Sequence, residues 1–146
     1  MSTDEPLLSP PRETRDVIPE SHHDIFEKES FAHFATLMPD GTPHVTPVWV
    51  DHENGEYVLL NSARGRQKVR NVERNPRVGV SVTDPDDPYR YVSVRGEAEL
   101  IDEGAVAHID KLAQKYMDVE EYPHHGEESG ARVIVRIPAD TVVTNG

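Results

Sequence analysis

Short runs of alternating apolar and polar residues fill much of the chain after residue 30, and this period of two predicts β-strands. Turn residues separate the runs, and Asn54-Gly55 is a strong hairpin signal. The run at 57–61 is apolar on both faces in its middle, which indicates a central strand. We expect strands over residues 31–37, 44–51, 57–61, 78–82, 89–101 and 132–137, the last resuming through 141–143.

Residues 66–74 and 103–117 carry apolar residues at helical spacing, and a shorter helix is expected over 21–29. Strands come first, then a helix, then more strands, which differs from the strict alternation of a parallel α/β sheet. We predict a mostly β protein with some α, in which six or more mainly antiparallel strands curl into a small barrel with two or three helices. Residues 22–146 form this single domain, after a proline-rich, mobile or draped N-terminal arm at 1–21.

Two of the expected strands contain unusual residues. Pro47 cannot donate a ladder hydrogen bond, so its strand must be bulged or lie at a sheet edge. The strand over 78–82 alternates valine with glycine and serine, which gives it one bulky face and one small face. A flat ligand or a partner strand can approach such a small face closely.

The composition is acidic, with 15 Lys and Arg against 27 Asp and Glu and a formal charge of −12. We therefore expect no nucleic-acid or membrane partner, because phosphate attraction needs a basic surface. No apolar run approaches the roughly 18 residues of a membrane span, and no signal-peptide pattern is present, so we expect a cytoplasmic protein. The absence of cysteine excludes thiolate sites and disulfides. The low share of lysine among the cations favours a halophilic source over an ordinary acidic protein.

One window reverses the acidic charge. Residues 64–77 hold six cations and one acid, a net charge of +5. The window follows a strand that ends near Asn61 and Ser62 and opens a helix, whose first turn offers free N–H groups. We interpret it as an anion site, most simply for a phosphate, and the alternative is a solvated helix face paired with acids elsewhere. It is not a Walker loop, because Gly-x-x-x-x-Gly-Lys is absent.

Two aromatic segments could border a planar ligand. Trp49 follows Pro47 and Val48, where exposed backbone groups could address the edge of a heterocycle, although a lone Trp in a strand is also typical of a core. Tyr89 and Arg90 place an aromatic ring beside a cation, which suits stacking on a ligand or a partner, or ordinary cross-strand packing.

Other chemistry is weakly indicated. The adjacent pairs His22-His23 and His124-His125 point their side chains apart, so neither makes a metal site by itself. A haem site has no histidine in a convincing context. No Gly-x-Ser-x-Gly elbow is present, so the sequence does not indicate a hydrolase.

Four groups of segments, each weak alone, together resemble the pyridoxamine 5′-phosphate oxidase-like family. The likeness covers roughly residues 28–140, and the subgroup it most resembles is that of the small actinobacterial and archaeal proteins that use the deazaflavin coenzyme F420. The segments are 34–37, 39–43 with 45–50, 64–71 with 75–78, and 88–96.

The resemblance implies a split β-barrel of the FMN-binding type. It also implies a homodimer with two cofactors, FMN or coenzyme F420, in clefts between the subunits. Arg66 and Lys68 would then bind the cofactor phosphate, with Asn61 and Ser62 nearby. The implied neighbours of the ring and cleft are Pro47, Val48 and Trp49, with Tyr89 and Arg90 as candidates for a cleft wall that the other subunit could supply.

The implied activity is an FMN- or F420-dependent oxidoreductase that transfers a hydride to or from an unidentified small molecule, with no catalytic side chain required. The alternative is a non-catalytic FMN or F420 binding or carrier protein. True pyridoxamine phosphate oxidases carry an Arg-x-His-type substrate motif near the C-terminus. The last strand, 132–137, has no such motif, which argues against pyridoxal phosphate synthesis. An acidic loop at 118–130 stands in place of the segment that lines the substrate side in those enzymes.

Overall fold

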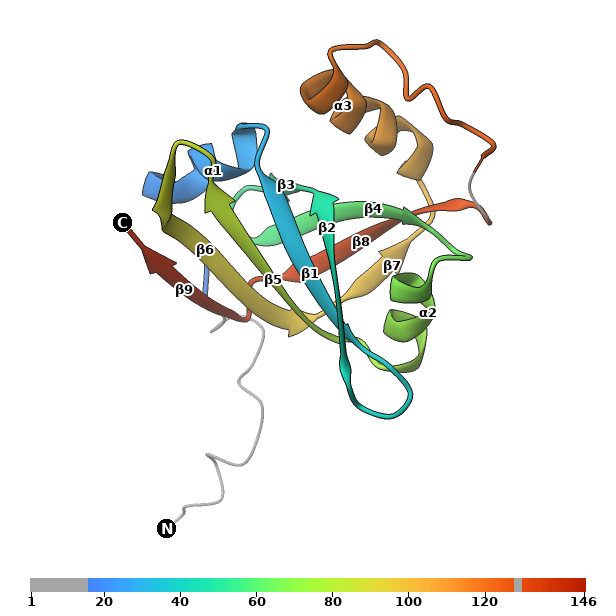
Figure 1. Ribbon diagram of the computed structural model, residues 1–146, viewed down its shortest axis with the longest axis horizontal. Coiled ribbons are helices and arrows are strands. Elements are labelled where there is room, and N and C mark those ends of the chain that lie inside the picture. Colours follow the sequence, from blue (N-terminus) through green and yellow to red (C-terminus); the bar gives the residue numbers. More distant parts are fainter. Residues whose placement is uncertain (1–15, 128–129) are drawn as a thin grey trace.

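The computed structural model describes residues 16–127 and 130–146, and these form two antiparallel β-sheets with short helices around them (Figure 1). The strands are β1 Phe31–Leu37, β2 Pro43–Trp49, β3 Asp51–Glu53, β4 Tyr57–Ala63, β5 Arg77–Asp84, β6 Asp87–Glu97, β7 Glu99–Ile101, β8 Arg132–Pro138 and β9 Thr141–Asn145. The helices are the 3₁₀ turn η3 Glu20–His22, α1 His23–Glu27, α2 Gln67–Arg74 and α3 Ala105–Met117.

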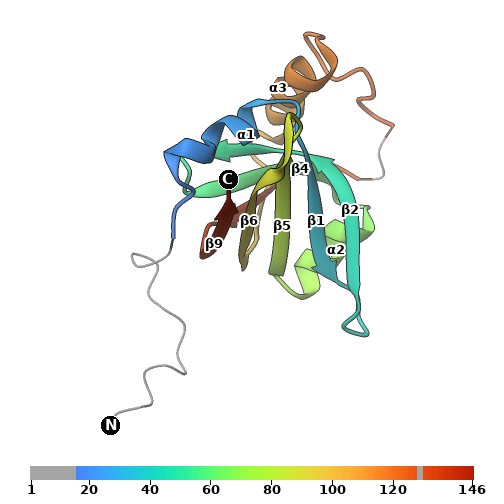
Figure 2. The ribbon, with the colours of Figure 1, turned by 60° about the vertical axis from the view of Figure 1, so that its left-hand side comes forward.

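The two sheets enclose one hydrophobic core. The five-stranded sheet has the order β2-β1-β5-β6-β9, seen side by side in Figure 2, and the four-stranded sheet has the order β3-β4-β8-β7. Their inward residues form a single cluster that includes Phe34, Val80, Val92, Val58, Leu60 and Ile137. The predicted mostly antiparallel split barrel is confirmed, with nine strands and three α-helices in the described ranges. The strand at 57–61 is central in its sheet, as predicted.

Two predicted strands are each divided in the structure. The strand predicted over 44–51 breaks at Val50, whose N–H donates to the Tyr116 hydroxyl at 3.1 Å and whose carbonyl accepts from Lys115 Nζ at 2.7 Å. The strand predicted over 89–101 breaks at Ala98, where the N–H donates to Pro76 O at 2.8 Å. At both breaks the chain passes from the five-stranded to the four-stranded sheet, because partners outside the ladder take its backbone bonds.

Pro47 lies on β2, at an edge of the five-stranded sheet. Pairing between β1 and β2 runs without a register shift from Phe31 opposite Trp49 to Leu37 opposite Pro43. Of the two arrangements predicted for this proline, the structure therefore shows the edge and not the bulge.

The outward side of the five-stranded sheet, here called the outer sheet face, is small in its centre and apolar at its sides. Across it, the register aligns Pro47, His33, Ser81, Ser93 and Val143 in one row. The apolar side chains Phe31, Val45 and Val143 on this face are 54%, 57% and 49% exposed.

The segment before β1 is tied to the barrel. Ile18 is 2% exposed, and its N–H donates to Gly55 O at 2.7 Å. Of the predicted arm at 1–21, residues 16–21 thus lie against the barrel, and residues 1–15 lie outside the described residues. Among the helices of the described ranges, none is long and apolar enough to cross a membrane.

Candidate functional site

A cavity of about 230 Å³ lies where the ends of β2 and β4, the start of α2 and one side of α3 meet. Its lining residues are Phe31, Pro47, Val48, Trp49, Asn61, Ser62, Ala63, Arg66, Lys68, Ile109, Leu112, Tyr122 and Arg132. Seven of the nine residues selected from the sequence are among them, namely Pro47, Val48, Trp49, Asn61, Ser62, Arg66 and Lys68. The structure therefore gathers the phosphate candidates and the ring candidates around one space.

One part of the cavity lining is cationic. Lys68 stands in the first turn of α2 and is 7% exposed, and Arg66 immediately precedes that helix. Arg66 is the N-cap residue: its carbonyl accepts from the Val69 N–H at 3.1 Å, and its side chain makes no capping bond. Ser62, also 7% exposed, adds a hydroxyl from β4. Two cations, a hydroxyl and a helix N-terminus together suit an anion of the phosphate type.

The other cations of the basic window have different partners. The Arg64 guanidinium donates to both carboxylate oxygens of Asp102 at 2.9 Å and to Glu73 at 2.9 Å. Arg70 donates to Gln67 Oε1 at 2.8 Å on the exposed side of α2. Arg64 is therefore paired with acids, as the alternative interpretation of the basic window expects. Arg66 and Lys68, in contrast, line the cavity.

A second part of the cavity lining is aromatic. The Trp49 ring stacks on Tyr116 with 5.0 Å between centroids and 2° between planes. The Tyr116 hydroxyl donates to Ser30 O and accepts from the Val50 N–H. Burial raises the pKa of Tyr116 to about 12, so this anchor stays a neutral phenol. Trp49 is therefore held in place from behind while it lines the cavity.

Sequence reasoning missed two polar members of the lining, Tyr122 and Arg132. Tyr122 lies in the acidic loop, where its N–H donates to Asp110 Oδ1 at 2.8 Å. Its ring is nearly perpendicular to that of Trp49, with 6.1 Å between the ring centroids. Arg132 begins β8, lies 5.4 Å from the centroid of the Tyr122 ring and donates to Asn61 Oδ1 at 2.9 Å. Both reach the cavity through contacts between distant parts of the chain, for which the local sequence carries no signal.

The apolar lining residues from α3 did have a signal. Ile109 and Leu112 belong to the stripe that predicted this helix, and they are 3% and 1% exposed. The same stripe therefore packs α3 onto the barrel and forms one wall of the cavity.

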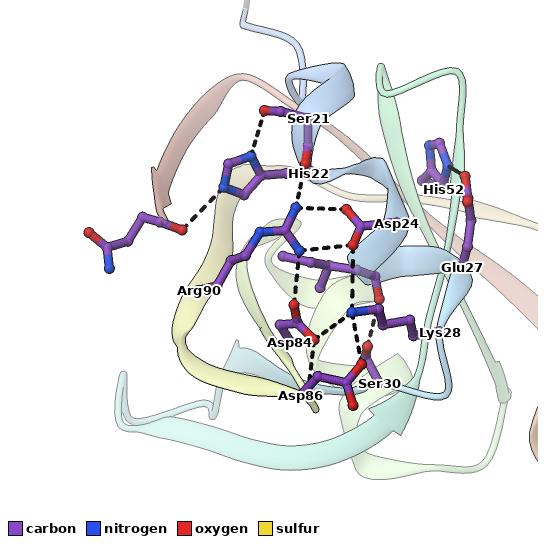
Figure 3. A network of polar contacts seen from close by, with 12 residues as sticks. Ser21, His22, Asp24, Glu27, Lys28, Ser30, His52, Asp84, Asp86 and Arg90 are labelled. Atoms are coloured by element: carbon purple, nitrogen blue, oxygen red, sulfur yellow. Dashed lines mark hydrogen bonds and ion pairs between the residues drawn. The ribbon is translucent and has the colours of Figure 1, made fainter.

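Tyr89 and Arg90 do not line the cavity of their own chain. Tyr89 is 79% exposed near the start of β6. The Arg90 guanidinium donates to Asp24 Oδ1 at 2.7 Å and to Asp84 Oδ2 at 2.9 Å (Figure 3). Lys28 Nζ donates to the other Asp84 oxygen at 2.8 Å, so Arg90 belongs to an ion network that joins α1 to the β5–β6 turn.

Comparison with known proteins agrees with this fold. The chain matches the family model of pyridoxamine 5′-phosphate oxidase over residues 18–145. Among curated proteins no sequence matches it. Among solved structures it is similar to an F420 reductase, at 35% identity and a TM-score of 0.75, over 86% of this chain and 98% of that one.

Two further structures extend the comparison. A conserved hypothetical protein from Mycobacterium tuberculosis is 29% identical, with a TM-score of 0.70 over 90% of this chain and 87% of that one. General Stress Protein 26 from Bacillus anthracis shares the fold, at 20% identity and a TM-score of 0.63 over 84% and 88%. Since the family model spans nearly all of the described residues, the chain belongs to the pyridoxamine 5′-phosphate oxidase family.

Proposed function

We propose that this protein binds a flavin-type cofactor, FMN or coenzyme F420, in the cavity and acts as an oxidoreductase on a small molecule. The observation that carries the proposal is that Arg66 and Lys68 share one cavity with the stacked Trp49. The likeness to a solved F420 reductase at 35% identity supports the same conclusion.

The residues present fit such a cofactor. The cationic part of the lining, with Arg66, Lys68, Ser62 and the start of α2, would hold the phosphate. Trp49, backed by Tyr116, would border the ring and keep water from it. When bound, the ring system supplies the hydride chemistry, and the chain supplies binding, orientation and exclusion of water.

A second copy of the chain would complete the site. The cavity, at about 230 Å³, is smaller than the roughly 300–1,000 Å³ of pockets that enclose a small ligand. Phe31 and Pro47 line the cavity and also lie on the outer sheet face. A partner packed on that face would therefore cover the apolar strands and close the cavity at the same time. The same packing could bring the partner's Tyr89 and the partner's Arg90 to the cleft.

Removing either cavity cation tests the anchor. We expect Arg66→Ala and Lys68→Ala each to weaken FMN or F420 binding by about tenfold or more, because each removes a charge-assisted contact to phosphate. Calorimetric titration in high salt, with each cofactor in turn, measures the loss and shows which cofactor is preferred.

Arg70→Ala is the matched control. Arg70 stands on the same helix and has the same charge, but it lies outside the cavity lining. It should retain the affinity of the unaltered protein. Equal losses in all three variants, or no loss in any, would contradict an anchor at Arg66 and Lys68.

Turnover separates an oxidoreductase from a carrier. The loaded protein is mixed with a nicotinamide or with reduced F420, and then with an acceptor, in stopped flow. Rapid reduction followed by rapid reoxidation is expected of an oxidoreductase. Tight binding without either step would assign the protein as a carrier.

A further inference from the structure

His108 is a buried histidine that lies behind the cavity and does not line it. It stands on α3, is 9% exposed, and its Nδ1 lies 3.0 Å from Asn61 Nδ2. On its other side, Asn61 accepts through Oδ1 from Arg132 Nε at 2.9 Å. A single amide group therefore connects His108 to a cation of the cavity wall.

The partners of Asn61 determine which way its amide faces. Arg132 Nε can only donate, so it must meet the amide oxygen. Ala105 O can only accept, and it meets the amide nitrogen at 2.9 Å. The atom of Asn61 that faces His108 is therefore the amide nitrogen, which can only donate. His108 Nδ1 must accept from it, so the neutral imidazole carries its proton on Nε2.

Charged groups surround the other face of the imidazole. His108 Nε2 lies 3.7 Å from Asp51 Oδ2 on β3 and has no hydrogen-bond partner among the described residues. Lys111 of α3 lies 3.1 Å from the same carboxylate oxygen, and Lys115 follows one turn later. Burial opposes the charge of Asp51, but its contacts with His108, the His52 N–H and Lys111 still lower its pKa, so it stays ionised.

We propose that His108 is a positioning residue for the cavity, whose neutral imidazole fixes the Asn61 amide and so holds the Arg132 guanidinium at the cavity wall. The proposal rests on the proposed function, in which the cavity takes an anionic cofactor. Arg132 then adds a third cation to Arg66 and Lys68 around that ligand.

The proposal makes the arrangement sensitive to acid. When Nδ1 takes up a proton from solvent it becomes a donor, and Asn61 must turn its oxygen toward His108. The amide NH₂ then faces Arg132 Nε, two donors meet, and Arg132 loses its hydrogen bond to Asn61. The new charge on His108 lies beside Asp51, which compensates it, so the dominant effect at the cavity is the loss of the Asn61–Arg132 hydrogen bond.

The first test needs no ligand. Nitrogen-15 NMR of the imidazole rings in the full chain should show neutral His108 protonated on Nε2. When the pH is lowered from about 8 to about 5, the Arg132 Nε–H signal should shift in step with the His108 signals. A neutral His108 ring protonated on Nδ1, or an Arg132 Nε–H signal that does not change with pH, would overturn the proposal.

The second test measures FMN affinity by calorimetry across the same pH range. The phosphate itself changes charge near pH 6, so every variant shares one acid effect and the comparison between variants is decisive. The glutamine of His108→Gln can accept from Asn61 but cannot gain a proton. On acidification, the FMN affinity of the unaltered protein should fall about tenfold more than that of His108→Gln. A loss of this size is expected for one charge-assisted contact.

Two further variants complete the design. His52→Gln removes a partly buried histidine that Asn61 does not contact, so its acid response should match that of the unaltered protein. Arg132→Gln should bind FMN more weakly at neutral pH and lose the extra acid response. An acid response in His108→Gln as large as in the unaltered protein would refute the proposal. If neither FMN nor F420 binds at any pH, the proposed function fails, and the NMR result alone decides the role of His108.

Discussion

Lys115 shows how one side chain can terminate a strand. Its ammonium donates to Phe26 O at 2.6 Å and to Val50 O at 2.7 Å, and lies 4.6 Å from the centroid of the Tyr116 ring. These bonds hold the chain where β2 ends and β3 begins, next to Trp49. Burial lowers the pKa of Lys115 to about 8. The ammonium therefore makes two short hydrogen bonds at a position where burial disfavours its positive charge.

The lowered pKa of Lys115 predicts an unusual dependence of stability on pH. Between about pH 8 and about 10 the unfolded chain retains the proton that the folded chain loses, so the free energy of unfolding should rise with pH there. Urea unfolding followed by circular dichroism at several pH values measures this slope. Lys115→Met should abolish it, whereas Lys111→Met, at a lysine 69% exposed on the same helix, should retain it. A flat profile in the unaltered protein would contradict the assignment.

At the scale of elements, the β3–β4 hairpin is a point of close approach. Asn54 and Gly55 both have positive φ, of 54° and 69°, as the Asn-Gly pair predicted. A Cβ at Gly55 would lie 2.5 Å from His23 Nε2 and 2.9 Å from Ile18 O. The hairpin turn therefore serves as the docking surface for the segment before β1.

Gly55→Ala should destabilise the fold by about 2–4 kcal/mol, because it adds a steric clash to the cost of a left-handed backbone. Gly41→Ala is the control: its φ is +88°, but a Cβ there meets nothing within 4 Å, so only about 1–2 kcal/mol should be lost. Urea unfolding of both variants gives the comparison. Equal losses would mean that the segment before β1 does not press on the hairpin.

The sequence predicted those elements whose signals are local. The strand at 31–37 has the predicted bounds, and α2 differs by one residue from the helix predicted at 66–74. The breaks at Val50 and Ala98 could not be predicted, because their hydrogen-bond partners lie far away in the chain. The site divides in the same way. The charge window located the cationic segment, and the family resemblance selected Arg66 and Lys68 within it, whereas the place of Arg132 depends on the pairing of β4 with β8.

At the scale of the whole molecule, the outer sheet face carries apolar side chains that remain exposed within residues 16–127 and 130–146. Its central row contains the small residues Ser81 and Ser93, and Val45 on the edge strand β2 is 57% exposed. Edge strands and apolar faces of this kind favour association with a second copy. The formal charge of −12 per chain opposes such association at low ionic strength.

We expect a dimer in sedimentation experiments at high salt and a weaker dimer at low salt. Val45→Glu should shift the protein to monomer and weaken cofactor binding at the same time, because the same face closes the cavity. Val106→Glu, at a valine 55% exposed on α3 and away from this face, should do neither. A monomer at high salt, or loss of the dimer with unchanged affinity, would contradict a cleft shared between subunits.

The position of Trp49 also gives the protein an optical probe of its own. It is the only tryptophan in the chain, and it lines the cavity while stacked on Tyr116. Tryptophan emission from this protein therefore originates beside the cavity and nowhere else. A ligand whose absorption overlaps that emission would quench it on entering, so occupancy could be followed without a label.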